Sequence, residues 1–310
     1  MLRIVFIFTF FFGCVKSELY IDKKDYKLNY IKSFGGSNDD EANDIINTSD
    51  GGFMVIGSST SSDGLIQNKM GFESDIILMK FDSDKSIEWV KNYGGSRDDR
   101  GQSVVEVSGI GYALLGYSMS NDGDASNNEG FHDNWVILID SKGDIIWEKS
   151  YGFSGHDHAY NIIKTKDGNL FFNGFLDVTA SRGLGSTKKL GKSIKHGVGE
   201  FWCHKIDLDG NILWRKYFGG TNNDRSYDSV ETSDGDFIIV GSSESSDNDI
   251  SSPKGSYDIW VIKLSSNGDL LWERSYGGSK YETANSIIQS SDKKIHILGS
   301  TLSDDKDISF

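Results

Sequence analysis

The sequence repeats itself about every 58 residues, and this period limits the possible folds more than any other feature. Each copy begins with an aromatic residue followed by two glycines, except that the third copy reads Tyr-Gly-Phe. Successive starting residues are 59, 58, 67 and 58 positions apart. A chain built from such copies must fold as an array of similar units. The starting residues are Phe34, Tyr93, Tyr151, Phe218 and Tyr276.

Each copy has the pattern of four short strands. In the fourth copy the turn Asp234-Gly235 precedes an apolar segment, 237–241, that ends in glycine. A polar loop leads to a third apolar segment, 258–264, and the turn Asn267-Gly268 leads to a last segment that contains Trp272. Short strands joined by Asp-Gly and Asn-Gly turns are typical of an antiparallel meander. No segment has a helical period, so the sequence predicts an all-β fold.

A single four-stranded sheet of this size cannot bury both of its faces, so the copies must pack on one another. Sheets packed around an axis form a β-propeller, which leaves only short edges exposed. A β-solenoid would need a shorter repeat, and a β-sandwich would not repeat at this length. We expect a large side chain from the last strand of each copy to lie between blades. These residues are Trp89, Trp147, Trp214 and Trp272.

The number of blades follows from counting half-copies. The first half of the unit, from the aromatic start through the segment that ends in glycine, occurs five times. The second half, the pair of segments with the tryptophan, occurs four times. Residues 19–34 resemble the missing second half, with Tyr30 in the tryptophan position. We therefore predict five blades, of which one is built from both chain ends and closes the ring by burying its edges. A truncated six- or seven-bladed chain is the alternative.

Residues 1–17 are typical of an export leader, with a basic start and an apolar stretch too short to span a bilayer as a helix. Gly13-Cys14 resembles a bacterial lipobox, which implies lipidation of Cys14 and attachment of the protein to a membrane only through that lipid. Phe11 and Phe12 depart from the usual lipobox residues, and an ordinary signal peptide is the alternative. We expect residues 18–310 to form the propeller as a single domain.

The repeated segments as a whole resemble a known group. Ser-Asp-Gly-Gly-Phe at 49–53, Val-Ile-Gly-Ser-Ser at 55–59 and Asp-Ile-Trp-Val-Ile-Lys-Leu at 258–264 are similar to the repeat β-propeller lipoproteins of Bacteroidota, with delta-60-like repeats. Members are sometimes labelled endoglucanase or bulb-type lectin. The resemblance covers residues 19–310 and implies a lipoprotein of the outer membrane or cell surface, with a periplasmic or secreted protein as the alternative.

Composition narrows the choice of partners. The formal charge is −14, which disfavours binding to DNA or RNA because phosphates repel an acidic chain. Two cysteines are too few for a disulfide scaffold, and 37% hydrophobic residues are too many for a disordered chain. We expect a monomer whose partner is a glycan or a protein.

One carboxylate recurs in every copy, four residues after the second glycine position. Five carboxylates around one axis can form a cation-binding mouth. The pattern equally fits a turn in which each carboxylate accepts backbone N–H bonds, and recurrence in every copy favours this structural role. The residues are Asp40, Asp99, Asp157, Asp224 and Glu282.

Two polar loops have the Asp-x-Asp-x-Ser spacing of calcium loops. Both lack the central glycine of an EF-hand, and solvated Asx turns are the alternative. Calcium is the one cofactor that the sequence indicates. The candidate ligands are Asp122, Asp124 and Ser126 in one loop and Asp247, Asp249 and Ser251 in the other.

The third copy differs from the others because segment 177–199 is longer and basic. Such a loop on an acidic body can dock an anionic glycan, a phosphate or a partner, and a tolerated surface insertion is the alternative. Two histidines in the same copy, two positions apart, suit a metal, but the sequence shows no third ligand. The candidate binding residues are Arg182, Lys188, Lys189, Lys192, Lys195, His196, His156 and His158.

Three functions remain open. The first is an exported, membrane-anchored propeller that binds a glycan or protein without catalysis. The second is a glycan-cleaving hydrolase, which needs two carboxyl groups in unlike environments. Since every recurrent carboxylate has equivalents in the other copies, the sequence argues against catalysis. The third is a purely structural surface protein.

Overall fold

The computed structural model describes residues 31–67, 69–186 and 199–308. These residues form eighteen β-strands, one short α-helix, α1 (Val178–Ser181), and one 3-10 helix, η1 (Lys306–Ile308). The strands form separate antiparallel sheets whose neighbours follow the order of the sequence. The predicted all-β class is therefore confirmed. Within the described ranges, no helix is long and apolar enough to cross a membrane.

Each complete copy of the repeat forms one four-stranded sheet, or blade. Blade 1 contains β1 (Asp40–Asn47), β2 (Phe53–Ser59), β3 (Asp75–Phe81) and β4 (Ile87–Tyr93). Blade 2 contains β5 (Asp99–Val107), β6 (Gly111–Ser118), β7 (Asp133–Asp140) and β8 (Ile145–Tyr151). Blade 3 contains β9 (His158–Lys164), β10 (Leu170–Leu176), β11 (Glu200–Ile206) and β12 (Ile212–Phe218). Blade 4 contains β13 (Asp224–Glu231), β14 (Phe237–Ser243), β15 (Asp258–Leu264) and β16 (Leu270–Tyr276). Blade 5 contains β17 (Glu282–Gln289) and β18 (Ile295–Thr301).

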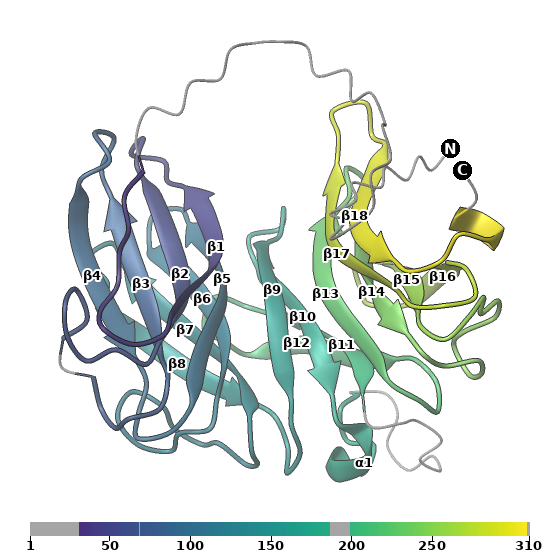
Figure 1. Cartoon of the computed structure of the whole chain (residues 1–310), viewed down its shortest axis with the longest axis horizontal. Helices are drawn as coiled ribbons and strands as arrows, with labels where there is room; N and C mark the ends of the chain where they lie inside the picture. Colours follow the sequence, from purple (N-terminus) through teal and green to yellow (C-terminus); the bar gives the residue numbers. More distant parts are fainter. Residues whose placement is uncertain (1–30, 68, 187–198, 309–310) are drawn as a thin grey trace.

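The blades succeed one another along an arc, from β1–β4 in purple and blue to β17–β18 in yellow (Figure 1). The first strands of neighbouring blades contact each other, so β1, β5, β9, β13 and β17 form the inner layer of the propeller. A residue at the same position of each first strand is consequently brought near its equivalents in the adjacent blades. The predicted propeller of four-stranded antiparallel blades is confirmed, and the number of blades agrees with five.

Hydrophobic cores lie between the blades, with each core shared by two sheets. In β6, the side chain of Leu114 belongs to the core shared with blade 1, whereas that of Leu115 belongs to the core shared with blade 3. Middle strands are therefore buried on both faces, which explains their nearly continuous apolar sequences. The four tryptophans predicted to lie between blades pack against these shared cores, as expected.

The glycine near the end of each second strand is required by a β-bulge in the first strand. In blade 2, the bulge between Gly101 and Ser103 shifts the register and brings the carbonyl of Arg100 against Gly116. A Cβ added to Gly116 would lie 2.0 Å from that carbonyl oxygen. The equivalent glycines of the other blades meet the equivalent carbonyls at 1.8 to 2.3 Å, so the repeated glycine reflects a close backbone approach.

The predicted closure of the ring falls mainly outside the described residues. Residues 31–34, the described part of the expected N-terminal strands, form no strand, and β18 pairs only with β17 in the described ranges. Blade 1 carries an apolar pocket of about 270 Å³ that is lined in part by Phe34, Phe53 and Phe81. Closure by residues 19–30 therefore stays a prediction.

Candidate functional site

The repeated carboxylates are structural groups in blades 2 to 5. Asp99 is fully buried and accepts hydrogen bonds from the backbone N–H of Gly95 and the hydroxyl of Ser120, each at 2.7 Å. Each equivalent carboxylate accepts a backbone N–H bond from the aromatic-Gly-Gly turn that precedes it. Asp157, Asp224 and Glu282 are also 0% exposed, whereas Asp40 is exposed. A ligand in solution cannot contact the four buried groups.

The residues directly after these carboxylates differ from blade to blade. They lie at the same end of adjacent inner strands, so they break the symmetry of the propeller at one place. Three consecutive blades contribute basic side chains there, and the first and fifth blades do not. In chain order the residues are Glu41, Arg100, His158, Arg225 and Thr283.

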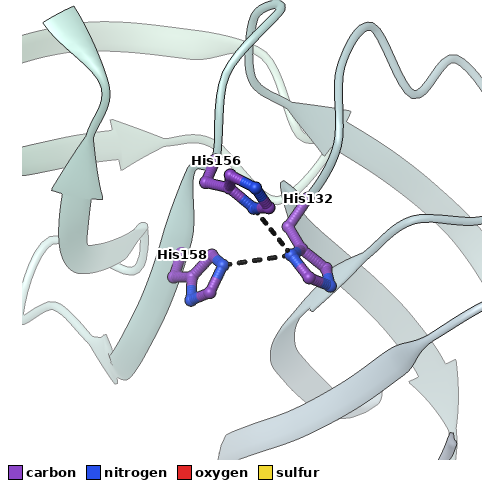
Figure 2. A group of neighbouring side chains, drawn as sticks. All are labelled: His132, His156 and His158. Carbon is purple, nitrogen blue, oxygen red and sulfur yellow. Dashed lines mark hydrogen bonds between the residues drawn. The ribbon is translucent and has the colours of Figure 1, made fainter. Parts of the chain in front are cut away.

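Two further histidines, His132 and His156, lie beside His158 at this end, and Figure 2 shows His156 and His158 each joined to His132. His132 Nδ1 lies 3.1 Å from His156 Nδ1 and 3.2 Å from His158 Nε2. One ring nitrogen from each residue lies within 4.8 Å of the other two. His132 and His158 are half-buried, and His156 is exposed. We call these three residues the histidine cluster; they are the group of metal-ligating side chains that the described part of the chain assembles.

The second nitrogen of His132 has a carboxylate partner. His132 Nε2 lies 3.2 Å from Asp98 Oδ2, and Asp98 also accepts from Arg100 Nε at 3.0 Å. Although burial alone would raise the pKa of Asp98, the hydrogen bonds from His132 and Arg100 hold it below its usual value. Asp98 is therefore an anion that orients the imidazole of His132.

Aromatic rings hold the other two imidazoles. Tyr117 stacks on His158 with ring centroids 4.0 Å apart, and Phe131 stacks on His156 at 4.7 Å. Burial lowers the pKa of His158 to about 3, and the neighbouring His132 adds to the shift. Burial followed by His132 also lowers the pKa of His156. Both rings are neutral imidazoles at physiological pH, with a lone pair available for a hydrogen bond or a metal.

The rim around the cluster carries exposed cationic and aromatic groups. The guanidinium of exposed Arg225 lies over the ring of Phe175 at 4.7 Å, and Phe175 in turn contacts His158 at 4.9 Å between ring centroids. Phe131, which stacks on His156, is 53% exposed; further along the same end, in blade 5, Tyr281 is 38% exposed and directly precedes the buried Glu282. The end of the inner layer thus combines positive charge, aromatic faces and a histidine cluster on an otherwise acidic chain.

Sequence reasoning selected His156 and His158 but missed His132, Asp98, Arg100 and Arg225. The repeat contains the missing signal. The backbone N–H of Asp157 donates to the carbonyl of His132 at 2.7 Å, which places residues 132 and 156 side by side. The equivalent bonds in the other blade junctions join residue 74 to 99, 199 to 224 and 257 to 282. Aligning positions 24 apart across the copies would therefore have paired the two histidines.

The candidate calcium ligands lie in loops whose oxygens make hydrogen bonds within the protein. Asp122 Oδ1 accepts the backbone N–H of Ser96 at 2.8 Å, and Asp124 Oδ2 accepts that of Gly94 at 3.2 Å. Asp247 and Asp249 accept from the equivalent turn of blade 4. Ser126 donates to Glu148, and Ser251 donates to Glu273. These loops fasten the aromatic-Gly-Gly turns, and calcium binding by them stays a prediction.

Most of the basic insertion falls outside the described residues. Of its candidate binding residues, only Arg182 is described, at the C-terminal cap of α1 with a left-handed φ of 53°. The α1 segment contacts the loop that carries His156, because Ser154 donates to the carbonyl of Ala180 at 3.0 Å. Cys14 and the remaining candidates, Lys188, Lys189, Lys192, Lys195 and His196, are not among the described residues.

No family model and no curated protein matches the sequence. Among solved structures, the chain is similar to an endo-arabinase from Bacteroides thetaiotaomicron VPI-5482. The TM-score is 0.43 at 14% sequence identity, over 86% of this chain and 92% of that chain. A similarity of this size carries no argument about activity.

Proposed function

We propose that this protein is an exported, membrane-anchored propeller that binds a glycan at the end of the inner strands, without catalysis. The observation that supports the proposal is the set of unlike residues at one position of adjacent blades. Arg100, His158 and Arg225 occupy positions where a symmetric repeat would place identical side chains. A single binding site on a repeat scaffold requires such local differences, since a symmetric surface offers several equivalent sites.

Burial of the carboxylates favours binding over hydrolysis. A glycosidase needs an acid and a second carboxylate on either side of the bond to be cleaved. Asp99, Asp157, Asp224 and Glu282 are fully buried and serve the turns, so they cannot flank a substrate. The carboxylate of Asp98 is partly accessible, but it is already paired with Arg100 and His132. A glycan-cleaving activity would have to use other residues.

The chemistry of the rim favours a glycan over a protein partner. Aromatic faces such as Phe131 and Tyr281 pack against the apolar faces of sugar rings, and guanidinium groups donate to sugar hydroxyls or carboxylates. Arg225 combines both features because it is exposed and lies over Phe175. We extend the proposal to the basic insertion, whose lysines would attract anionic glycans.

The proposed location rests on the sequence. Residues 1–17 have the pattern of an export leader, and Gly13-Cys14 resembles a lipobox, in line with the resemblance to Bacteroidota repeat lipoproteins with delta-60-like repeats. We propose lipidation of Cys14 and a monomer at the outer membrane or cell surface. Metabolic labelling with a fatty acid should mark the parent chain and not a Cys14→Ser variant; equal labelling of both would contradict the anchor.

The function is tested by a glycan array combined with a polysaccharide hydrolysis assay on the chain from residue 18. We expect binding without turnover, and at least about tenfold weaker binding in Arg225→Ala. Lys142→Ala is the matched control, because Lys142 is an exposed cation in the β7–β8 turn. That turn lies at the end of its blade away from the starts of the inner strands, where Arg225 lies. Turnover would favour the hydrolase, and neither binding nor turnover would favour a structural protein.

A further inference from the structure

We propose that the histidine cluster is a metal centre that binds one divalent transition-metal ion of the zinc class. The ligand atoms are His132 Nδ1, His156 Nδ1 and His158 Nε2. This inference goes beyond glycan binding and does not depend on it. It rests on the distances in the cluster, on the proton positions that Asp98 imposes, and on the exposure of one side of the site.

The distances suit one ion. Zinc–imidazole bonds are about 2.0–2.1 Å long, and tetrahedral coordination then sets ligand nitrogens about 3.3 Å apart. The nitrogen of His132 lies 3.1 Å from that of His156 and 3.2 Å from that of His158. All three lie within 4.8 Å of one another, and the exposed His156 ring can rotate to bring its nitrogen to the coordination distance from that of His158.

The protons of the cluster favour a cation at its centre. A neutral imidazole has one N–H and one lone pair. Because Asp98 accepts the N–H at His132 Nε2, His132 Nδ1 presents its lone pair to the other two histidines. Where His132 is neutral and no metal is bound, both neighbours would have to donate to that single lone pair. A metal ion instead accepts a lone pair from each of the three rings.

Asp98 is the outer partner that a metal-bound histidine requires. Histidine ligands usually donate their second N–H to a carboxylate, which fixes the ring and makes the ligating nitrogen more basic. Arg100 holds Asp98 in place through its Nε. Tyr117 and Phe131 stack on the rings of His158 and His156, so the orientation of all three ligands is set by neighbours.

The ligand type selects the class of ion. Three neutral imidazoles suit Zn²⁺, Cu²⁺, Ni²⁺ or Co²⁺, whereas Ca²⁺ and Mg²⁺ prefer oxygen ligands. The proposal is therefore separate from calcium binding by the Asp122 and Asp247 loops. Three protein ligands leave a fourth coordination position, and the exposure of His156 opens it to solvent. Water or an oxygen of a bound ligand would occupy that position.

The test uses the chain from residue 18, purified with chelator and then titrated with Co²⁺ and Zn²⁺. We expect one ion per chain, a dissociation constant of about 1 μM or tighter, and visible Co²⁺ absorption typical of tetrahedral nitrogen coordination. His132→Ala and His158→Ala should weaken binding at least about 100-fold, and Asp98→Asn about 10- to 100-fold. Millimolar Ca²⁺ should not displace the ion.

His296→Ala is the matched control, because His296 lies on β18 and its Nε2 contacts Ser290 rather than the cluster. His156→Ala serves as the second variant, since its exposed ring can be removed without opening a core, even where His158→Ala fails to fold. Unchanged affinity in His132→Ala or His156→Ala, or less than one ion per chain, would overturn the proposal. Metal binding without any glycan binding would overturn only the proposed function.

Discussion

The backbone N–H of Gly95 donates a 2.7 Å hydrogen bond to Asp99 Oδ2, four residues further along the chain. Equivalent bonds join Gly36 to Asp40, Gly220 to Asp224 and Gly278 to Glu282. Each bond fastens an aromatic-Gly-Gly turn to the first strand of the blade that follows. The carboxylate thereby fixes how one blade enters the next.

We predict that the cost of removing this carboxylate depends on its burial. Asp99→Ala should lower the free energy of unfolding by about 3 kcal/mol, because several buried donors lose their acceptor. Asp40→Ala, at the same position of the exposed first blade, should cost about 1 kcal/mol. Urea unfolding followed by tryptophan fluorescence measures both. Equal losses would contradict the structural role assigned to the buried group.

The bulge opposite the second strand predicts a strong effect of one methyl group. Gly116→Ala should destabilise the protein by about 3 kcal/mol, since the new Cβ would clash with the Arg100 carbonyl in a rigid inner strand. Gly109→Ala is the control: its φ is +80° and nothing lies within 4 Å of the added Cβ, so backbone strain alone should cost about 1 kcal/mol. Thermal unfolding of the two variants separates clash from strain. Similar melting temperatures would rule out the close approach.

The burial of the Asp75 carboxyl group predicts that the stability of the protein depends on pH. Burial raises its pKa to about 7, with the Asp99 carboxylate adding to the shift and the Lys69 ammonium opposing it. The unfolded chain releases this proton near its ordinary value of 3.8. Between about pH 4 and 7 the folded state therefore keeps a proton on Asp75 that the unfolded chain has released. The stability that this proton contributes is lost as pH rises through that window.

Asp75→Asn should remove that slope. Relative to the parent, the variant should gain stability on going from pH 4 to pH 8, because an amide needs no proton to stay neutral. Melting temperatures of both proteins at the two pH values give the comparison. A difference between variant and parent that stays constant with pH would show that Asp75 is ionised throughout.

Closure of the ring predicts that the N-terminal segment stabilises the fold. β18 pairs only with β17 in the described ranges, and Ile288, Leu298 and Leu302 are exposed on blade 5. A chain beginning at residue 31 should melt roughly 10 °C lower than one beginning at residue 18 and should associate through the open edge. Calorimetry and size-exclusion chromatography test both effects. Identical melting and elution would contradict closure by residues 19–30.

The sequence predicts the blades well because their signals are local. Asp-Gly turns and strand glycines such as Gly116 recur because backbone geometry demands them, and the tryptophans recur because they fill the space between blades. The functional site depends instead on what differs between copies. His132 lies 24 residues before His156, in a different blade, and only the pairing of blade junctions brings them together. Arg100 and Arg225 stand in strand positions that, taken singly, read as ordinary exposed charges.

Each middle strand contributes side chains to two cores, as β6 does through Leu114 and Leu115. This sharing makes the whole repeat the smallest step by which such a chain can lengthen or shorten during evolution. Loss of a complete copy removes one side from each of two cores, and the exposed faces of the flanking blades have matching positions that can meet. Loss of half a copy would instead leave a sheet whose remaining face has no counterpart.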